Sequence, residues 1–356
     1  MELLAPSLFF KVVSVMEKKR NLSIDLLRVI AAFSILILHG GACLPISGTI
    51  AATISQYGVP IFALITGYFY FKNPTKERRI KTISNILWLW FFWILVYFPQ
   101  AIYSGSLNVF FNAHPNIKDV FWGFLNLIIY QGAGCFYGGW YLLSLAVCLL
   151  IIDFCRRHKV MWMGWIFTIV VYIAGLLTSN YQTVFPKLLP QYRSSIVTWG
   201  LFGTLVWCLT AYYVVKYEQV LRKYIKTWHW LVLAFGLTFT EFAITRVCKF
   251  NTNPAGFNNQ YFITLPISIV IVFVYTLNHS KMADAKKAKF LRDISTLIYL
   301  VQFGVKDVLG NIYKISIPYY TYPYLFNTII WTLIISLLIW FVSQLPYFNW
   351  LKKSYE

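Results

Sequence analysis

The sequence predicts an all-α, multi-pass membrane protein with about ten transmembrane helices and both termini in the cytoplasm. Of its 356 residues, 59% are hydrophobic and only 12% are charged, and the mean hydropathy is +0.62. Soluble domains carry charge on about a quarter of their residues. So few charges cannot solvate this much apolar surface. This excludes a disordered chain and, despite a net charge of +19, a soluble nucleic-acid-binding protein.

Apolar runs long enough to cross a bilayer, about 20 residues each, recur along the whole chain with polar breaks between them. The predicted spans are 24–42, 54–71, 82–103, 137–154, 160–177, 196–215, 228–247, 261–277, 294–310 and 324–345. A further apolar stretch, 118–131, is shorter. It is either an eleventh crossing, which would invert everything after it, or a helix lying in the outer interface.

The basic residues favour the ten-helix arrangement, because cytoplasmic loops carry an excess of lysine and arginine. With the N-terminus inside, 23 of the 31 lysine and arginine residues fall in cytoplasmic segments. They would orient the chain and contact anionic lipid. We therefore expect a cytoplasmic segment at 1–20, one membrane domain at 21–347 and a cytoplasmic tail at 348–356. Residues 1–15 precede Met16, which we expect to be the translation start.

The first predicted helix carries three polar residues that are unusual inside a membrane: Asp25, Arg28 and His39. A charge in the bilayer costs a few kcal/mol, so a retained one usually faces a cavity or a partner. Asp25 and Arg28 are three residues apart. Arg28 and His39 are eleven apart, which is within about 20° of three full helical turns. All three therefore share one face, with about 16 Å between Arg28 and His39 along the axis.

Each of these residues has a structural interpretation beside the functional one. Asp25 and Arg28 form either an ion pair that anchors the helix or part of a site. His39 makes an interhelical hydrogen bond or acts as a base or nucleophile near neutral pH. Glu241, within the seventh span, lines the same cavity or bonds a neighbouring helix. Six cysteines without a CxxC pair predict neither a metal site nor a disulfide framework.

The chain also carries a series of short motifs in a fixed order. They are the first-helix stretch IDLLRVIAAFSILILHG at 24–40, VPIFALITGYF at 59–69, the basic loop KERRIK at 76–81, GWYL at 139–142, and DISTLIYLVQ at 293–302. This ordered set resembles the integral-membrane acyltransferase-3 family, bacterial enzymes that acylate sugars and related polyols of the cell envelope. The sequence departs from the family pattern at Thr66, usually serine, and at Gln302, where a histidine is common.

The resemblance implies roles for individual residues. His39 resembles the family's essential histidine, either a base for a sugar hydroxyl or a transient acyl carrier, with Arg28 as its partner and Asp25 beside it. Another set resembles the groups that meet the phosphates of a cytoplasmic acyl-CoA: Arg78, Arg79 and Lys81. We expect the substrate cavity to be lined by Trp140, Glu241 and Gln302.

These inferences together predict an O-acyltransferase of the bacterial plasma membrane. It would move an acyl group, most often acetyl, from acyl-CoA to a hydroxyl of a cell-surface polysaccharide or another envelope glycan. The donor is a substrate, and no permanently bound cofactor or metal is expected. The chain would complete transfer alone or pass the acyl group to a separate extracellular protein. The alternative is a transporter or flippase of an envelope glycan precursor, although the chain lacks two matching halves.

Overall fold

The computed structural model describes residues 20–41, 53–72, 74–103, 136, 138–184, 200–250, 261–313 and 321–356. Within them the protein is helical apart from one short antiparallel pair, β1 (Arg20–Asn21) with β2 (Met282–Ala283). The stretch 118–131 and residues 1–15 lie outside the described residues. The eleventh-crossing alternative and the predicted start therefore stay predictions.

Each of the ten predicted spans overlaps one helix in the described part of the chain. These helices are α2 (Leu22–Gly41), α4 (Gly58–Lys72), α5 (Lys76–Tyr103), α8 (Gly139–Arg157), α9 (Met161–Thr178), α11 (Leu205–Lys216), α13 (His229–Val247), α14 (Leu265–Asn278), α15 (Ala285–Tyr313) and α16 (Tyr322–Ser343). Two short elements complete the order, α12 (Glu218–Tyr224) and the 3-10 helix η4 (Pro346–Ser354).

Six of these helices are long and apolar enough to cross a membrane: α2, α5, α8, α9, α13 and α16. Two more, α11 and α14, are apolar but shorter. The chain is thus an all-helical, multi-pass membrane protein by its helix lengths and composition. Ten crossings and cytoplasmic termini remain predictions.

Two helices, α5 and α15, begin well before their predicted spans, which start at 82 and 294. Residues 76–81, predicted as an inner loop, form the first turns of α5, and the Thr75 hydroxyl oxygen accepts from the Arg78 N–H at 3.3 Å. Helix α15 begins at Ala285, where the carboxylate of Asp284 accepts from the Lys286 N–H at 2.9 Å. Side-chain acceptors of this kind stabilise a helix start. The basic segments extend the helices because these caps precede them.

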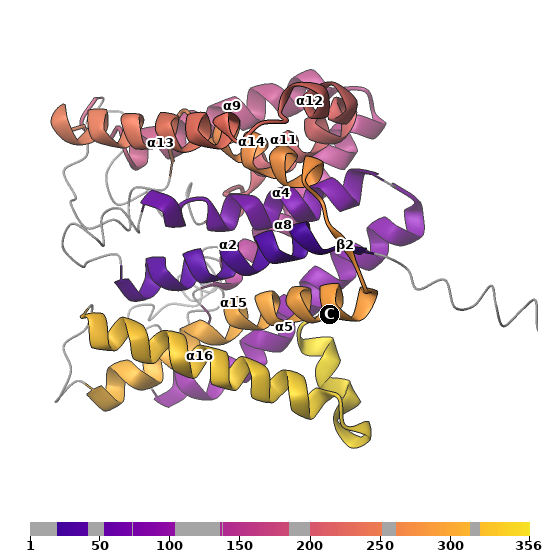
Figure 1. Cartoon of the computed structure of the whole chain (residues 1–356), viewed down its shortest axis with the longest axis vertical. Helices are drawn as coiled ribbons and strands as arrows, with labels where there is room; N and C mark the ends of the chain where they lie inside the picture. Colours follow the sequence, from indigo (N-terminus) through magenta and orange to yellow (C-terminus); the bar gives the residue numbers. More distant parts are fainter. Residues whose placement is uncertain are drawn as a thin grey trace, which may run out of the picture.

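Helix α2 packs between α4 and α15 (Figure 1). The most apolar stretches of α2 and α8 are 50% and 61% buried, whereas those of α5 and α16 are only 17% buried. Residues that project from α5 and α16 therefore form much of the surface that hydrocarbon would cover. The inward-facing polar residues of α2 lie inside the bundle rather than on its lipid side.

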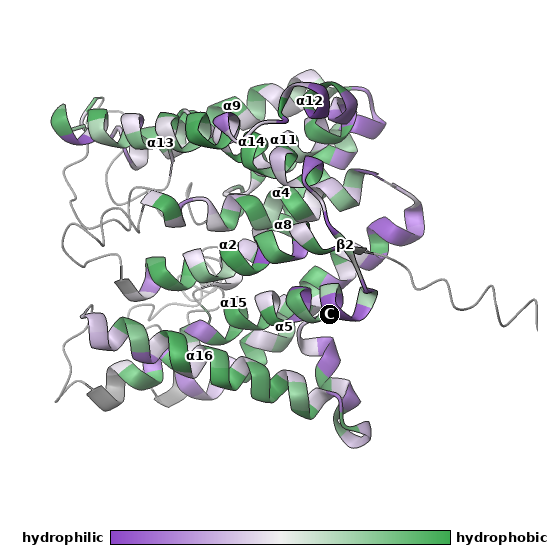
Figure 2. Ribbon diagram, in the orientation of Figure 1, coloured by the Kyte–Doolittle hydropathy of each residue, from purple (hydrophilic) through white to green (hydrophobic). Residues whose placement is uncertain are grey.

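One end of the bundle is distinctly hydrophilic. The ends of α4, α8, α11 and α14 and the starts of α2, α5 and α15 meet there, beside α12 and β2 (Figure 1). Figure 2 shows hydrophilic residues gathered at this end, while the helix bodies are mainly hydrophobic. Most of the basic segments that were predicted to be cytoplasmic belong to these helix ends.

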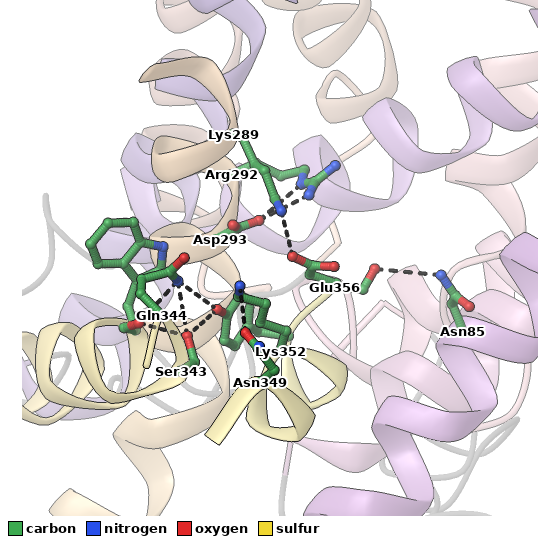
Figure 3. A network of polar contacts seen from close by, with 11 residues as sticks. Asn85, Lys289, Arg292, Asp293, Ser343, Gln344, Asn349, Lys352 and Glu356 are labelled. Carbon is green, nitrogen blue, oxygen red and sulfur yellow. Dashed lines mark hydrogen bonds and ion pairs between the residues drawn. The ribbon is translucent and has the colours of Figure 1, made fainter. Parts of the chain in front are cut away.

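The C-terminal residues dock onto the bundle at the hydrophilic end (Figure 3). The Trp93 indole N–H of α5 donates to the Ser354 carbonyl at 2.8 Å, and Lys289 of α15 pairs with Glu356 at 2.6 Å. Tyr355 is 2% exposed and its hydroxyl lies 2.5 Å from that of Ser343. Burial raises the pKa of the Tyr355 phenol. The predicted tail is therefore a packed element that links α5, α15 and α16.

Candidate functional site

The predicted polar face of α2 is present on one uninterrupted helix. Arg28 Nη1 lies 3.6 Å from Asp25 Oδ1, which confirms the ion pair between them. The Arg28 guanidinium also lies 5.9 Å from the ring centre of Phe69 on α4. Because α2 is one continuous helix from Leu22 to Gly41, Arg28 and His39 lie on the same face of it, about 16 Å apart along the helix axis.

Arg28 lies beside residues from two other motifs. The Tyr141 hydroxyl of α8 is hydrogen-bonded to Thr66 of α4, and Arg28 interacts electrostatically with Tyr141. Thr66 replaces the family's usual serine yet keeps the hydroxyl that this bond needs. The first, second and fourth sequence motifs therefore meet at the Arg28 end of the polar face.

The opposite end of this face meets α15. The His39 ring packs against Phe303 with centroids 5.1 Å apart and a 59° tilt, and Lys306 interacts electrostatically with the imidazole. The neighbouring Gln302 is 2% exposed, and its Nε2 donates to the Tyr299 carbonyl at 3.0 Å. Its Oε1 is buried without a hydrogen-bond partner among the described residues. Burying an unpaired acceptor is costly, so this atom is a place where a substrate group can donate.

A series of aromatic rings runs between Arg28 and His39. The rings of Tyr141 and Tyr299 have centroids 5.6 Å apart, and those of Tyr299 and Phe303 are 5.9 Å apart. The Tyr299 hydroxyl donates to the Gly138 carbonyl at 2.6 Å, which ties α15 to the start of α8. The three rings are buried, with Tyr141 4%, Tyr299 5% and Phe303 5% exposed.

Sequence reasoning did not select Tyr141 or Tyr299 as site residues, although both stand inside motifs that it quoted. Their shared signal was a tyrosine followed by leucine within an apolar run, at 141–142 and 299–300. Trp140, which it did select, is partly buried, and its ring centroid lies 6.2 Å from that of Tyr141 in an edge-on contact.

Glu241 is held at the start of a neighbouring helix. Its carboxylate accepts from the N–H groups of Ile263 and Thr264 at 2.6 and 2.8 Å. It also accepts from the Thr264 hydroxyl at 2.7 Å and from the Tyr181 hydroxyl. Of the two roles considered for Glu241, these contacts correspond to a bond with a neighbouring helix, because Glu241 of α13 caps the start of α14. The structure describes no contact between Glu241 and His39.

The three basic residues predicted for the donor separate into two kinds. Arg78 and Lys81 are exposed on the first turns of α5. Arg79 is mostly buried and its Nε lies 3.6 Å from Oδ2 of Asp153, a carboxylate that is 1% exposed. Asp153 also pairs with Arg156 at 2.8 Å and Arg157 at 3.1 Å. The sequence analysis did not select Asp153. The feature that distinguishes it in the sequence is an isolated acidic residue at the end of an apolar run, followed closely by Arg156 and Arg157.

Metal ligation finds no support in the residues that the structure describes, because no three histidine, cysteine or acidic side chains cluster there. The chemistry of the arrangement is instead that of an acid–base group, His39, and a cation, Arg28. Buried aromatic side chains lie between the α2, α8 and α15 residues of this set, and a buried acceptor, Gln302, precedes the Phe303 that contacts His39. Such a set suits transfer of a group that water would otherwise hydrolyse.

Comparison with known proteins identifies the family. The sequence model of the acyltransferase-3 family, described as an acyltransferase domain, matches residues 21–347. The chain therefore belongs to this family of membrane acyltransferases. The match confirms the resemblance carried by the ordered motifs.

Two curated bacterial proteins are similar to the chain. An amino-acid racemase of Enterococcus faecalis is 23% identical over 317 residues, which cover 83% of this chain and 42% of the racemase. A serine/alanine racemase of Enterococcus gallinarum is 30% identical over 103 residues, which cover 25% of this chain and 14% of that protein. The chain thus spans less than half the length of both relatives. No solved structure matches it.

Proposed function

We propose that the protein is an O-acyltransferase that moves an acyl group, in particular acetyl, from cytoplasmic acyl-CoA to a hydroxyl of an envelope glycan. The observation that carries the proposal is the placement of Arg28 and His39 on one face of the continuous helix α2, joined by buried aromatic rings. Family membership supports acyl transfer in general. The donor and the acceptor are those that the resemblance of the ordered motifs to this family implies.

The proposed orientation has all ten long helices crossing the plasma membrane with both termini in the cytoplasm. The helix ends that carry most of the basic segments lie together at the hydrophilic end of the bundle (Figures 1 and 2). Cytoplasmic segments are enriched in lysine and arginine, so this end would be the cytoplasmic one. Arg28, nearer the start of α2, would then lie on the donor side, and His39 would lie nearer the acceptor.

An acyl-CoA carries several phosphate charges and cannot enter hydrocarbon, so its nucleotide end would stay at the cytoplasmic face. Arg78 and Lys81, which are exposed there, would bind phosphate oxygens. Arg79 would contribute less directly, because it is paired with the buried Asp153. The thioester end would extend toward Arg28 along the aromatic rings, away from bulk water.

His39 would activate the acceptor. In direct transfer its imidazole takes the proton of the sugar hydroxyl, whose oxygen attacks the thioester carbonyl. The carbon–sulfur bond breaks, and the coenzyme A thiolate leaves and takes up a proton. In the covalent alternative the imidazole nitrogen attacks the thioester carbonyl, and the carbon–sulfur bond breaks as the coenzyme A thiolate leaves. The sugar hydroxyl then takes the acyl group from the imidazole as the nitrogen–acyl bond breaks, and its proton passes to the released imidazole nitrogen. Gln302 cannot carry a proton, but its unpaired Oε1 would accept a hydrogen bond from the substrate.

Inside-out membrane vesicles test the proposal, because they expose the cytoplasmic face and retain the native acceptor. Vesicles containing the wild-type protein and given radiolabelled acetyl-CoA are expected to transfer label to envelope glycan. His39→Ala and Arg28→Ala should abolish this transfer at equal protein abundance, whereas Lys223→Ala, an exposed change on α12, should preserve it. Transfer no greater than in vesicles without the protein would contradict the proposal. Movement of an unmodified glycan precursor across the membrane would favour the transporter alternative.

A further inference from the structure

A second candidate site lies on the outside of the bundle, between α5 and α8. The structure has a cavity of about 640 Å³ there, and Tyr70 of α4 forms part of its wall. None of the residues that surround Arg28 or His39 lines this cavity. We call it the α5–α8 groove.

The charged end of the groove has an excess of positive charge. Lys76, Arg79 and Arg157 line it together with Asp153. Asp153 is the shared partner of Arg79, Arg157 and the adjacent Arg156, so one carboxylate faces three guanidinium groups. The Arg157 side chain is still 50% exposed despite this ion pair. The groove therefore offers cations whose charge the protein does not balance locally.

The Tyr70 hydroxyl gives an independent indication of a ligand. Tyr70 is 4% exposed, lines the groove, and its hydroxyl has no hydrogen-bond partner in the part of the chain that the structure describes. Asp153 and its arginines are near enough to interact electrostatically with this hydroxyl. A buried hydroxyl without a partner is destabilising, and an anionic oxygen bound beside the arginines would accept its proton.

The rest of the groove is apolar and faces outward. Ile83, Leu87 and Phe91 follow one another at four-residue intervals on α5 and line the groove on one face, with Leu150 of α8 opposite. Leu87 is 38% exposed, Phe91 48% and Leu150 44%. The distance along α5 from Arg79 to Phe91 is about 18 Å. This is close to the thickness of one leaflet's hydrocarbon, about half of 30 Å.

We propose that the α5–α8 groove binds an anionic phospholipid of the cytoplasmic leaflet. The headgroup phosphate accepts hydrogen bonds from Arg79, Arg157 and Tyr70, and one acyl chain lies along Leu87 and Phe91. Basic pockets between transmembrane helices are suited to anionic headgroups. A water-soluble nucleotide would leave the outward-facing apolar wall without a partner, whereas a lipid fills both parts of the groove.

Native mass spectrometry of the purified full chain tests this proposal. The protein in detergent is titrated with palmitoyl-oleoyl phosphatidylglycerol and, separately, with phosphatidylcholine of the same acyl chains. Both lipids offer the same phosphate, but the choline ammonium of phosphatidylcholine would lie beside the excess positive charge of Lys76, Arg79 and Arg157. Phosphatidylglycerol is therefore expected to bind at least about tenfold more tightly, because placing like charges side by side is costly. Arg157→Ala should remove this preference, whereas Lys223→Ala, which removes an exposed cation of α12 outside the groove, should preserve it.

A second variant separates binding from folding. Tyr70→Phe keeps the buried ring and removes only the hydroxyl, so it should weaken phosphatidylglycerol binding without reducing the thermal stability of the lipid-free protein. Equal binding of both lipids by the wild type, or full phosphatidylglycerol binding by both variants, would overturn the proposal. Competition of coenzyme A with phosphatidylglycerol for this site would overturn it too, by showing a nucleotide site. None of these measurements depends on acyl transfer.

Discussion

The carboxylate of Glu241 is expected to stabilise the fold rather than to act in catalysis. Each of its oxygens accepts two hydrogen bonds: Oε1 from Tyr181 and the Ile263 N–H, and Oε2 from the N–H and hydroxyl of Thr264. In Glu241→Gln an amide nitrogen replaces one oxygen and faces two donors. Losing two charge-assisted bonds of about 1.5–3 kcal/mol each predicts a destabilisation of about 3–6 kcal/mol.

Size-exclusion chromatography of the detergent-solubilised protein after heating measures this loss. The midpoint for disappearance of the monodisperse peak should fall by roughly 6–24 °C, since each kcal/mol shifts such midpoints by about 2–4 °C in large domains. Glu77→Gln, an exposed glutamate on α5, is the matched control and should leave the midpoint unchanged. Protein that survives purification should retain acyl transfer per folded molecule. Wild-type stability combined with lost transfer would refute the structural role and place Glu241 in the substrate cavity.

Two further substitutions test other parts of the structure: Gln302→Leu tests the candidate site, and Tyr355→Phe tests the docking of the C-terminal residues. Gln302→Leu removes a buried acceptor that has no partner among the described residues, so stability should be unchanged or higher by up to about 2 kcal/mol while acyl transfer falls. The thermal midpoint measures the change in stability, and the vesicle assay measures the change in acyl transfer. A Gln302→Leu protein that is destabilised but still active would contradict a role for Gln302 in binding the substrate. Tyr355→Phe removes the hydrogen bond to Ser343 and should cost about 1 kcal/mol. Tyr347→Phe, at a side chain 90% exposed, should not change the midpoint, and equal effects would refute docking of the C-terminal residues.

The sequence predicted the helices and the polar face of α2 because both depend on local periodicity. A long apolar run predicts a helix whatever its tertiary contacts are. Residues three and eleven positions apart share a face on any straight helix. The ion pair of Asp25 and Arg28 follows from the same spacing. The family resemblance rested on motifs that are likewise continuous in the chain.

The remaining features depend on contacts between distant segments. Tyr141 and Tyr299 are far apart in the chain, and only packing of α15 against the start of α8 brings their rings together. Glu241 finds its partners in the segment before α14, so its sequence position alone left two alternatives. Asp153 looked unremarkable in sequence because its partner Arg79 belongs to a different helix.

The measurement that tests the central claim most directly is the ester content of envelope glycans. Proton NMR and mass spectrometry would compare cells that have the gene, cells that lack it, and cells that express His39→Ala at normal membrane abundance. The account predicts that O-acyl groups disappear in the deletion and stay missing in the variant, and the acylated sugar then names the acceptor. Unchanged ester content in all three strains would contradict acyl transfer to envelope glycan by the Arg28 and His39 face of α2.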